Sequence, residues 1–178
     1  DGNLFIDGVY HQLISNHKRE INQKHLDNDF KIFSFGRFNK IELIENNLNI
    51  TTQDPNARIL IKNTKIEDLK ISFDLKIDQN SNFNNKLLSN LRGCLNFYNV
   101  ELVNVDIASK NCKLEDSVNI VKSNGQINNL NISNSSSDAL DNDFSNLNFK
   151  KVVVNYSGND CLDFSYGTYY IKESDIKN

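Results

Sequence analysis

The chain has 178 residues, enough for one domain with a hydrophobic core, and its formal net charge is −3 from 20 basic and 23 acidic side chains. This weakly acidic balance argues against a nucleic-acid-binding protein, which would normally present a basic face. No run of about 18 apolar residues is present, so the sequence predicts no membrane-spanning helix.

Residues 1–30 show no repeat and are expected to form an N-terminal cap over one end of the core. Residues 4–6 and 9–11 predict short strands, whereas the polar segment 16–26 is consistent with either a surface helix or a loop. The three histidines are His11, His17 and His25, and their spacings of 6 and 8 do not place them on one helical face. They therefore give little support to a metal site in the cap.

From residue 38 onward, three apolar residues recur in the order apolar, two others, apolar, one other, apolar. The sets are Phe38/Ile41/Leu43, Ile66/Leu69/Ile71, Leu102/Val105/Ile107, Ile127/Leu130/Ile132, Phe149/Val152/Val154 and, with one polar member, Ile171/Ser174/Ile176. The alternating part of each set is typical of a β-strand, and the two unmatched positions suit a corner. The long step between the second and third sets predicts an insertion loop at 74–92, where a binding side or a tolerated surface excursion are equally good explanations.

Three similar segments follow at 115–119, 137–141 and 159–163, and their first aspartates, Asp116, Asp138 and Asp160, are 22 residues apart each time. A fixed period near 22 residues with strand-like content indicates a stacked solenoid. The prediction is an all-β fold, a right-handed parallel β-helix of about six coils over residues 31–178. A leucine-rich repeat is the alternative, but the return segments are rich in Asn and Ser rather than helix-forming.

The sequence contains 31 asparagines, by a count over the whole chain. Asparagine tolerates left-handed backbone and hydrogen-bonds within turns, so this excess suits a fold with many corners, although an AT-rich genome would also produce it. Cys94 and Cys161 occupy the small-residue position of their repeats and are interpreted as buried thiols. A Cys94–Cys112 disulfide would be expected only in a secreted chain.

Stacking the coils places Asp116, Asp138 and Asp160 in one column, with Asn119, Asp141 and Asp163 in a second column. Two carboxylates about 4.8 Å apart repel each other by roughly 3.5 kcal/mol at an effective dielectric constant near 20. A calcium ion, a raised pKa or backbone N–H donors in the turns could offset this repulsion. The candidate calcium ligands are Asp116, Asp138, Asp141, Asp160 and Asp163, and the candidate catalytic residues are Asp138, Asp160 and Asp163.

The segments 137–140 and 158–162 resemble the paired aspartate motifs of polygalacturonase-type glycoside hydrolases, which are right-handed parallel β-helices of the pectin lyase-like kind. The resemblance places Asp138 and Asp160 on two of the three family aspartates, but Asn159 on the third, which serves there as general acid. The Gly-His-Gly and Arg-Ile-Lys motifs of that family are absent from this sequence. The resemblance therefore implies the fold and argues against that hydrolytic activity.

A second resemblance, over 93–178, is to bacterial β-helix repeat proteins that are associated with spore-coat CotH-type modules and surface-polysaccharide machinery. It rests on the segments 93–98, 115–119, 137–141 and 158–163. It implies a non-catalytic β-helix module at the bacterial cell surface or secreted, with polysaccharide as partner. The alternative is a carbohydrate-active enzyme, namely a polysaccharide lyase, hydrolase or epimerase, that uses the stacked aspartates.

The apolar pattern still runs at Ile171 and Ile176 near the end of the sequence. An open solenoid end exposes strand edges, so we expect either further coils beyond Asn178 or end-to-end self-association with another chain.

Overall fold

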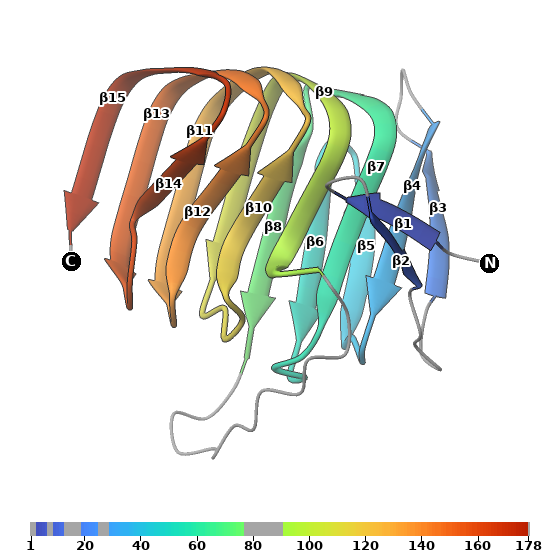
Figure 1. Ribbon diagram of the computed structural model, residues 1–178. Coiled ribbons are helices and arrows are strands. Elements are labelled where there is room, and N and C mark those ends of the chain that lie inside the picture. Colours follow the sequence, from blue (N-terminus) through green and yellow to red (C-terminus); the bar gives the residue numbers. More distant parts are fainter. Residues whose placement is uncertain (1–2, 7–8, 13–18, 25–28, 77–90, 178) are drawn as a thin grey trace.

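A computed structural model describes residues 3–6, 9–12, 19–24, 29–76 and 91–177, with side chains from residue 30 onward. All regular elements in these ranges are β-strands (Figure 1), and none is a helix that could span a membrane. The strands are β1 (Asn3–Ile6), β2 (Val9–Gln12), β3 (Arg19–Lys24), β4 (Asp29–Phe35), β5 (Lys40–Ile44), β6 (Asn47–Thr52), β7 (Arg58–Glu67), β8 (Lys70–Leu75), β9 (Gly93–Lys110), β10 (Asp116–Val121), β11 (Asn124–Ser135), β12 (Asp138–Asp143), β13 (Asn146–Ser157), β14 (Leu162–Ser165) and β15 (Thr168–Lys177).

The strands from β6 to β15 stack as a parallel β-helix of about five turns, which confirms the predicted fold class. One ladder runs β7–β9–β10–β12–β14, and the other runs β6–β8–β9–β11–β13–β15. The long strand β9 bends and contributes to both ladders. The 22-residue repeat is the register of the stack, since Val118 pairs with Leu140 and Leu140 with Leu162.

The core lies inside the coils and is built from the repeating apolar positions. Val118, Leu140, Ile132 and Val152 are completely buried. Burial of each such side chain contributes roughly 1.5–3 kcal/mol. Asn142 interrupts this core, because it stacks between Ile120 and Phe164 and its buried amide has no hydrogen-bond partner.

The corners stack in columns of residues with positive φ. One column is Asn63, Asn99, Lys122, Phe144 and Tyr166, with φ between 48° and 52°. Asn99 Nδ2 donates to Asn63 Oδ1 at 2.9 Å, so asparagines on neighbouring coils also bond each other. The expected role of asparagine in corners is confirmed there, but the later coils place Lys122, Phe144 and Tyr166 in this strained backbone, at a cost of about 1 kcal/mol each.

Gly125 explains why one corner admits no side chain. Its φ is +123°, and a Cβ atom there would lie 1.9 Å from the carbonyl oxygen of Leu102 on the preceding coil. Only glycine allows the two backbones to approach this closely.

The prediction that residues 38–43 belong to the first parallel coil is wrong. Ile41 and Leu43 lie in β5, which pairs antiparallel with β6, so that Ile41 faces Ile50. Strand β4 is likewise antiparallel to both β3 and β7. An apolar alternation has the same period in either direction of pairing, so the sequence pattern did not distinguish this hairpin from a coil, and the stack has about five turns rather than six.

The register between the third and fourth predicted sets is also corrected. Val105 pairs with Ile127 and Ile107 with Leu130, a step of 22 or 23 residues instead of the expected 25. The ladder is irregular between Gly125 and Asn129. The bulge explains the difference. The ladder pairs Leu102 with Gly125, whereas the apolar pattern aligned Leu102 with Ile127, two residues further along the chain.

At the N-terminus, β1 and β2 form an antiparallel hairpin, which confirms the two short strands expected there. The prediction of a helix or loop at 16–26 is wrong at β3 (Arg19–Lys24), which is a strand. The side chains of His11, His17 and His25 and most of the insertion loop at 74–92 lie outside the described residues.

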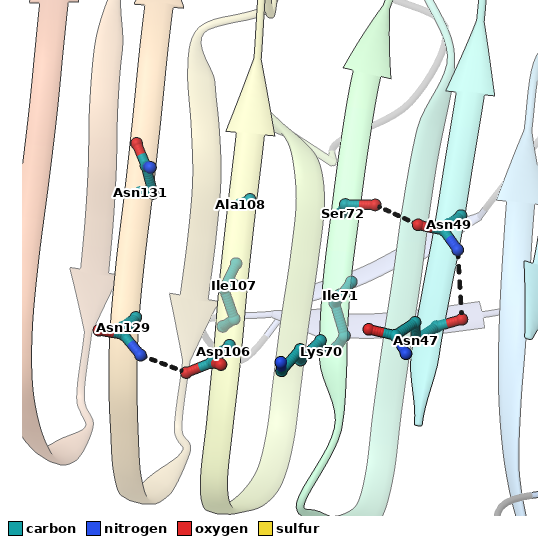
Figure 2. A pocket seen from close by; sticks show the side chains of 10 residues that line it. All are labelled: Asn47, Asn49, Lys70, Ile71, Ser72, Asp106, Ile107, Ala108, Asn129 and Asn131. Carbon is teal, nitrogen blue, oxygen red and sulfur yellow. Dashed lines mark hydrogen bonds between the residues drawn. The ribbon is translucent and has the colours of Figure 1, made fainter. Parts of the chain in front are cut away.

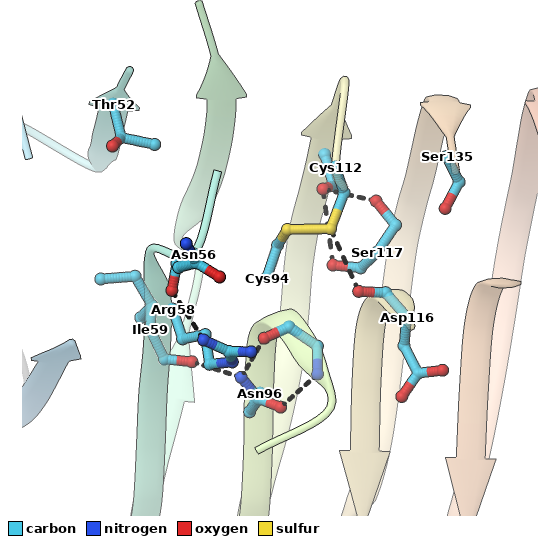
Figure 3. Close-up of a disulfide and its surroundings, with 12 residues drawn as sticks. Thr52, Asn56, Arg58, Ile59, Cys94, Asn96, Cys112, Asp116, Ser117 and Ser135 are labelled. Carbon is cyan, nitrogen blue, oxygen red and sulfur yellow. Dashed lines mark hydrogen bonds between the residues drawn. A yellow bond between two sulfur atoms is a disulfide. The ribbon is translucent and has the colours of Figure 1, made fainter. Parts of the chain in front are cut away.

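A disulfide joins Cys94 and Cys112 (Figure 3), so the interpretation of Cys94 as a free thiol is wrong. The two residues are 18 positions apart, and β9 carries the chain around most of one coil between them, which brings their Cα atoms to 6.1 Å. A loop of this length limits the unfolded chain and contributes about 3 kcal/mol in the chain-entropy account. Cys161 is free and only half-buried.

Candidate functional site

The predicted aspartate columns lie side by side in the ladder β10–β12–β14. Asp116 pairs with Asp138, and the amide of Asp160 donates to Asp138 Oδ1 at 3.0 Å, so the three residues occupy successive coils. In the second column, Asn119 pairs with Asp141 and Asp141 with Asp163. The 22-residue spacing therefore placed these side chains correctly.

Their surroundings divide the columns into a buried and an exposed group. The buried carboxylate pair is defined as Asp116 and Asp141, which are 1% and 8% exposed. Asn119 lies between them, and its Nδ2 donates to Asp116 Oδ2 and to Asp141 Oδ2, both at 2.9 Å. One amide group thus bridges two carboxyl groups that would otherwise repel each other.

Burial raises the pKa of Asp116 to about 7, and the charge of Asp141 adds to the rise. The hydrogen bond from Asn119 favours the ionised form and offsets part of this effect. Burial also raises the pKa of Asp141 to about 6, with further contributions from Asp143 and Asp163, whereas Arg92 acts in the opposite direction. A raised pKa is therefore one of the ways in which this protein tolerates the stacked carboxyl groups.

The exposed carboxylate trio is defined as Asp160 and Asp163, which are exposed, together with the half-buried Asp138. One carboxylate oxygen from each lies within 4.8 Å of the others. Asp138 Oδ1 also accepts a hydrogen bond from Asn159 Nδ2 at 2.8 Å, in addition to the one from the Asp160 amide. N–H donors of the next coil therefore satisfy Asp138, rather than backbone N–H groups of its own turn as the backbone alternative expects.

The trio meets part of the requirement for calcium, which takes six to eight oxygen ligands in flexible geometry. Three carboxylates supply a strong start, but Asn159 turns its nitrogen toward Asp138, not its oxygen. In the described part of the chain, this is the group of three or more metal-binding side chains that comes together, and Asp116 and Asp141 lie outside it. The five predicted calcium ligands thus fall into two separate groups.

An exposed aromatic stack lies at the other end of β12 and β14. Phe144 and Tyr166 follow these strands and stack with ring centroids 5.1 Å apart and planes inclined by 4°. They are 46% and 78% exposed. The sequence analysis missed this pair, although Phe144 and Tyr166 are themselves 22 residues apart and follow the aspartate repeat directly.

A polysaccharide lyase would need a base such as a tyrosine, and Tyr169 is poorly suited to that role. Its hydroxyl donates to the carbonyl of Asn142 at 2.9 Å and accepts from the amide of Ser145 at 3.3 Å. Burial raises its pKa. These contacts hold the phenol in place as a structural bridge between neighbouring coils.

The charge around the carboxylates is also partly compensated. Arg92 forms an ion pair with Glu115 at 3.3 Å, and its charge lowers the pKa of Asp141. Both partners of this pair are more than half exposed, so solvent weakens the ion pair itself.

In chemical terms, this face offers an accessible carboxylate trio and an accessible aromatic stack on the same two strands. The two carboxyl groups with a raised pKa are buried beside this face, Asp141 next to Asp163 and Asp116 on the neighbouring strand β10. Comparisons of the chain with family models, with curated proteins and with solved structures found no match in any of the three. The carboxylate trio and the aromatic stack of β12 and β14 are therefore the features that indicate a function.

Proposed function

We propose that this protein is a non-catalytic β-helix module that binds polysaccharide through the outer face of β12 and β14. The observation that carries the proposal is the pairing of two accessible features on these strands. The Phe144–Tyr166 stack lies at one end, and the exposed carboxylate trio lies at the other.

The chemistry of the two features matches that of a sugar chain. A flat aromatic surface packs against the C–H face of a sugar ring, and exposed aromatic side chains are enriched at binding surfaces. Carboxylates accept hydrogen bonds from sugar hydroxyl groups. Asp138 and Phe144 are about 20 Å apart along β12, and Asp163 and Tyr166 are about 10 Å apart along β14, so the face suits two or more linked sugars.

The buried position of the proton-holding groups supports a binding role over a catalytic one. Glycoside hydrolysis requires a carboxylic acid that reaches the leaving oxygen and a carboxylate that activates water or attacks the sugar. Asp116 has a pKa of about 7 but is only 1% exposed. Asn159, at the position of the third aspartate in the polygalacturonase-type motif, carries an amide that cannot donate this proton.

The second candidate is a carbohydrate-active enzyme, and a single observation favours it. Burial raises the pKa of Asp141 to about 6, and the charges of Asp143 and Asp163 add to that rise. A carboxyl group of this kind could supply a proton near neutral pH. Its 8% exposure leaves little access for a substrate oxygen, so this candidate ranks second.

We place the module at the cell surface or in the secreted fraction of a bacterium. The Cys94–Cys112 disulfide supports this location, because such bonds persist mainly in oxidising compartments. We also propose that the last coil packs against a second chain. Its core side chains Leu162, Phe164 and Ile171 are only half-buried, unlike their equivalents on earlier coils.

The test is a glycan array probed with the chain in the presence and absence of calcium. We expect retention of one class of polysaccharide, and weaker retention after either Asp163→Asn or Tyr166→Ser. Tyr170→Ser is the matched control, since Tyr170 is 61% exposed but lies on β15 in the other ladder. An array without any retained glycan, or equal retention by Tyr166→Ser and the parent chain, would refute the proposal.

A further inference from the structure

A second surface lies on the ladder β6–β8–β9–β11, away from the carboxylate face. A shallow pocket of about 270 Å³ lies there, and Figure 2 shows the side chains that line it. Two ladder rows border it, and each row takes one residue from each of the four strands. The rows are Asn47, Lys70, Asp106 and Asn129, and Asn49, Ser72, Ala108 and Asn131.

The hollow has a simple cause in the sequence. Ala108 stands in a row whose other members, Asn49, Ser72 and Asn131, carry longer polar side chains. Its methyl group leaves a gap at the centre of the row and forms the apolar floor. Ile71 and Ile107 also border the pocket, but their side chains are buried in the core. The floor is therefore apolar and the rim polar, which is the usual make-up of a small-molecule site.

Hydrogen bonds hold part of the rim in place before any ligand arrives. Asn129 Nδ2 donates to Asp106 Oδ1 at 2.7 Å, and Ser72 Oγ donates to Asn49 Oδ1 at 3.0 Å. Figure 2 shows both bonds on opposite sides of Ala108. Side chains that are already positioned lose less conformational freedom on binding.

Other rim groups remain available for a ligand. The side-chain amides of Asn47 and Asn131 and the ammonium group of Lys70 have no hydrogen-bond or ion-pair partner within the described residues. Lys70 and Asp106 are neighbours in the ladder but do not form an ion pair. The site thus offers hydrogen-bond donors and acceptors, some neutral and some charged, around one apolar patch.

The charges select the class of ligand. One cation, Lys70, and one anion, Asp106, face the pocket, so its formal net charge is zero. An anionic ligand would meet the Asp106 carboxylate, and a cationic one would meet Lys70. Amides and a hydroxyl group make up the rest of the rim, and these groups hydrogen-bond sugar hydroxyls without requiring charge.

We propose that this pocket binds one neutral sugar unit of a glycan, with the C–H face of the ring on Ala108 and the hydroxyl groups toward Asn131, Asn47 and Lys70. It is a site distinct from the carboxylate face and rests on the proposed function only for the choice of carbohydrate as ligand class. Neighbouring coils repeat about every 4.8 Å, so a chain lying across the strands would continue past the pocket along the same rows.

The experiment is an NMR titration of the whole chain with neutral oligosaccharides built from glucose, galactose or mannose, and with oligogalacturonate as the charged comparison. We expect a neutral oligosaccharide to shift the backbone amide signals of Ser72, Ala108 and Asn131 with millimolar affinity. A concentration of about 50 mM lies far above a millimolar dissociation constant. Absence of such shifts at that concentration of every neutral oligosaccharide would overturn the proposal. Shifts produced by oligogalacturonate alone would overturn the neutral class.

Two bulky variants make the test specific. Ala108→Tyr fills the pocket and should weaken binding at least about tenfold, a change of 1.4 kcal/mol. Val103→Tyr is the matched control, because Val103 is also a half-buried residue of β9 but pairs with Glu67 in the other ladder and does not line the pocket. Equal affinity of the Ala108→Tyr variant and the parent would overturn the proposal.

The variants Asp163→Asn and Tyr166→Ser separate this inference from the proposed function. Both should retain the pocket shifts while showing weaker retention on the glycan array. If the array result fails but the pocket shifts persist, the carboxylate face is wrong and the pocket stands. If the pocket shifts vanish in Tyr166→Ser although the variant is folded, the two sites are one and the separate pocket is refuted.

Discussion

Asp116 and Asp160 occupy the same position of the 22-residue repeat, two coils apart, yet they differ in environment. Asp116 lies between β9 and β12, is 1% exposed, and is bonded to Asn119. Asp160 belongs to the last coil of the described stack and is exposed, next to Asp138 and Asp163. The comparison teaches that the repeat sets the position of a carboxyl group, whereas its neighbours in the stack set its proton affinity and its accessibility.

The same contrast assigns different tasks to the two groups. The buried pair Asp116 and Asp141 shares the amide of Asn119 and is closed off from large ligands. The exposed trio is accessible and close enough for one ligand or cation to touch all three side chains. Four experiments can break or sharpen this distinction.

The largest expected effect is a loss of stability as the pH rises. The folded-state pKa of Asp116 is about 7, above its unfolded value of 3.8, so the folded protein holds a proton that the unfolded chain releases. This contribution is fully present below pH 3.8 and disappears as the pH rises through 7. Between pH 5 and pH 8 it amounts to about 2.5 kcal/mol of the free energy of unfolding, measured by urea denaturation.

Asp116→Asn should remove most of this dependence, because an amide keeps an oxygen acceptor for Asn119 without a titrating charge. The matched control is Asp160→Asn, which lies in an exposed turn and should retain the parent slope. Parallel pH profiles for the parent and Asp116→Asn would show that the buried pair does not control stability.

The second effect is on glycan binding, and it should depend on the exposed trio rather than on the buried pair. Asp163→Asn should lower glycan affinity about tenfold, or 1.4 kcal/mol, while changing the free energy of unfolding by less than about 0.5 kcal/mol. Asp116→Asn should leave glycan affinity unchanged at pH 8. Glycan binding that depends on Asp116 but not on Asp163 would reverse the roles assigned to the two groups.

The third effect is calcium binding at the exposed trio. At a free concentration five times its dissociation constant, calcium should stabilise the protein by about 1 kcal/mol, visible as a rise in melting temperature. Chelator should remove this rise, and so should Asp163→Asn, whereas Asp116→Asn should retain it. A melting temperature that calcium does not change in the parent chain would leave the hydrogen bonds from Asn159 and Asp160 to Asp138 as the compensation for the trio.

The smallest expected signal is catalytic. No reducing sugar should be released from polygalacturonate or from neutral polysaccharides, because Asn159 lacks the proton and the buried pair lacks access. General acid–base catalysis typically contributes 10²- to 10⁴-fold, so its loss leaves a rate near background. Release by the parent chain that disappears in both Asp138→Ala and Asp160→Ala would establish the enzyme instead.

The candidate site could be predicted from the sequence where the 22-residue repeat is regular. The aspartate columns and the apolar pairs of β10, β12 and β14 could be placed from the sequence, because a fixed 22-residue period determines which residues stack. Phe144 and Tyr166 have the same 22-residue spacing, but the apolar and aspartate patterns did not include them. The β5–β6 hairpin was misassigned, since apolar alternation carries no information on strand direction.

The sequence by itself determined the solenoid, its period and the residues in each column, since these depend only on local alternation and on spacing along the chain. The tertiary structure alone decided which carboxyl groups are buried, that Asn119 bridges Asp116 and Asp141, and that Cys94 meets Cys112. It also decided that Ala108 opens a pocket between longer side chains. Burial, proton affinity and hollows depend on what each neighbouring coil places beside a residue, and a repeat pattern does not carry that information.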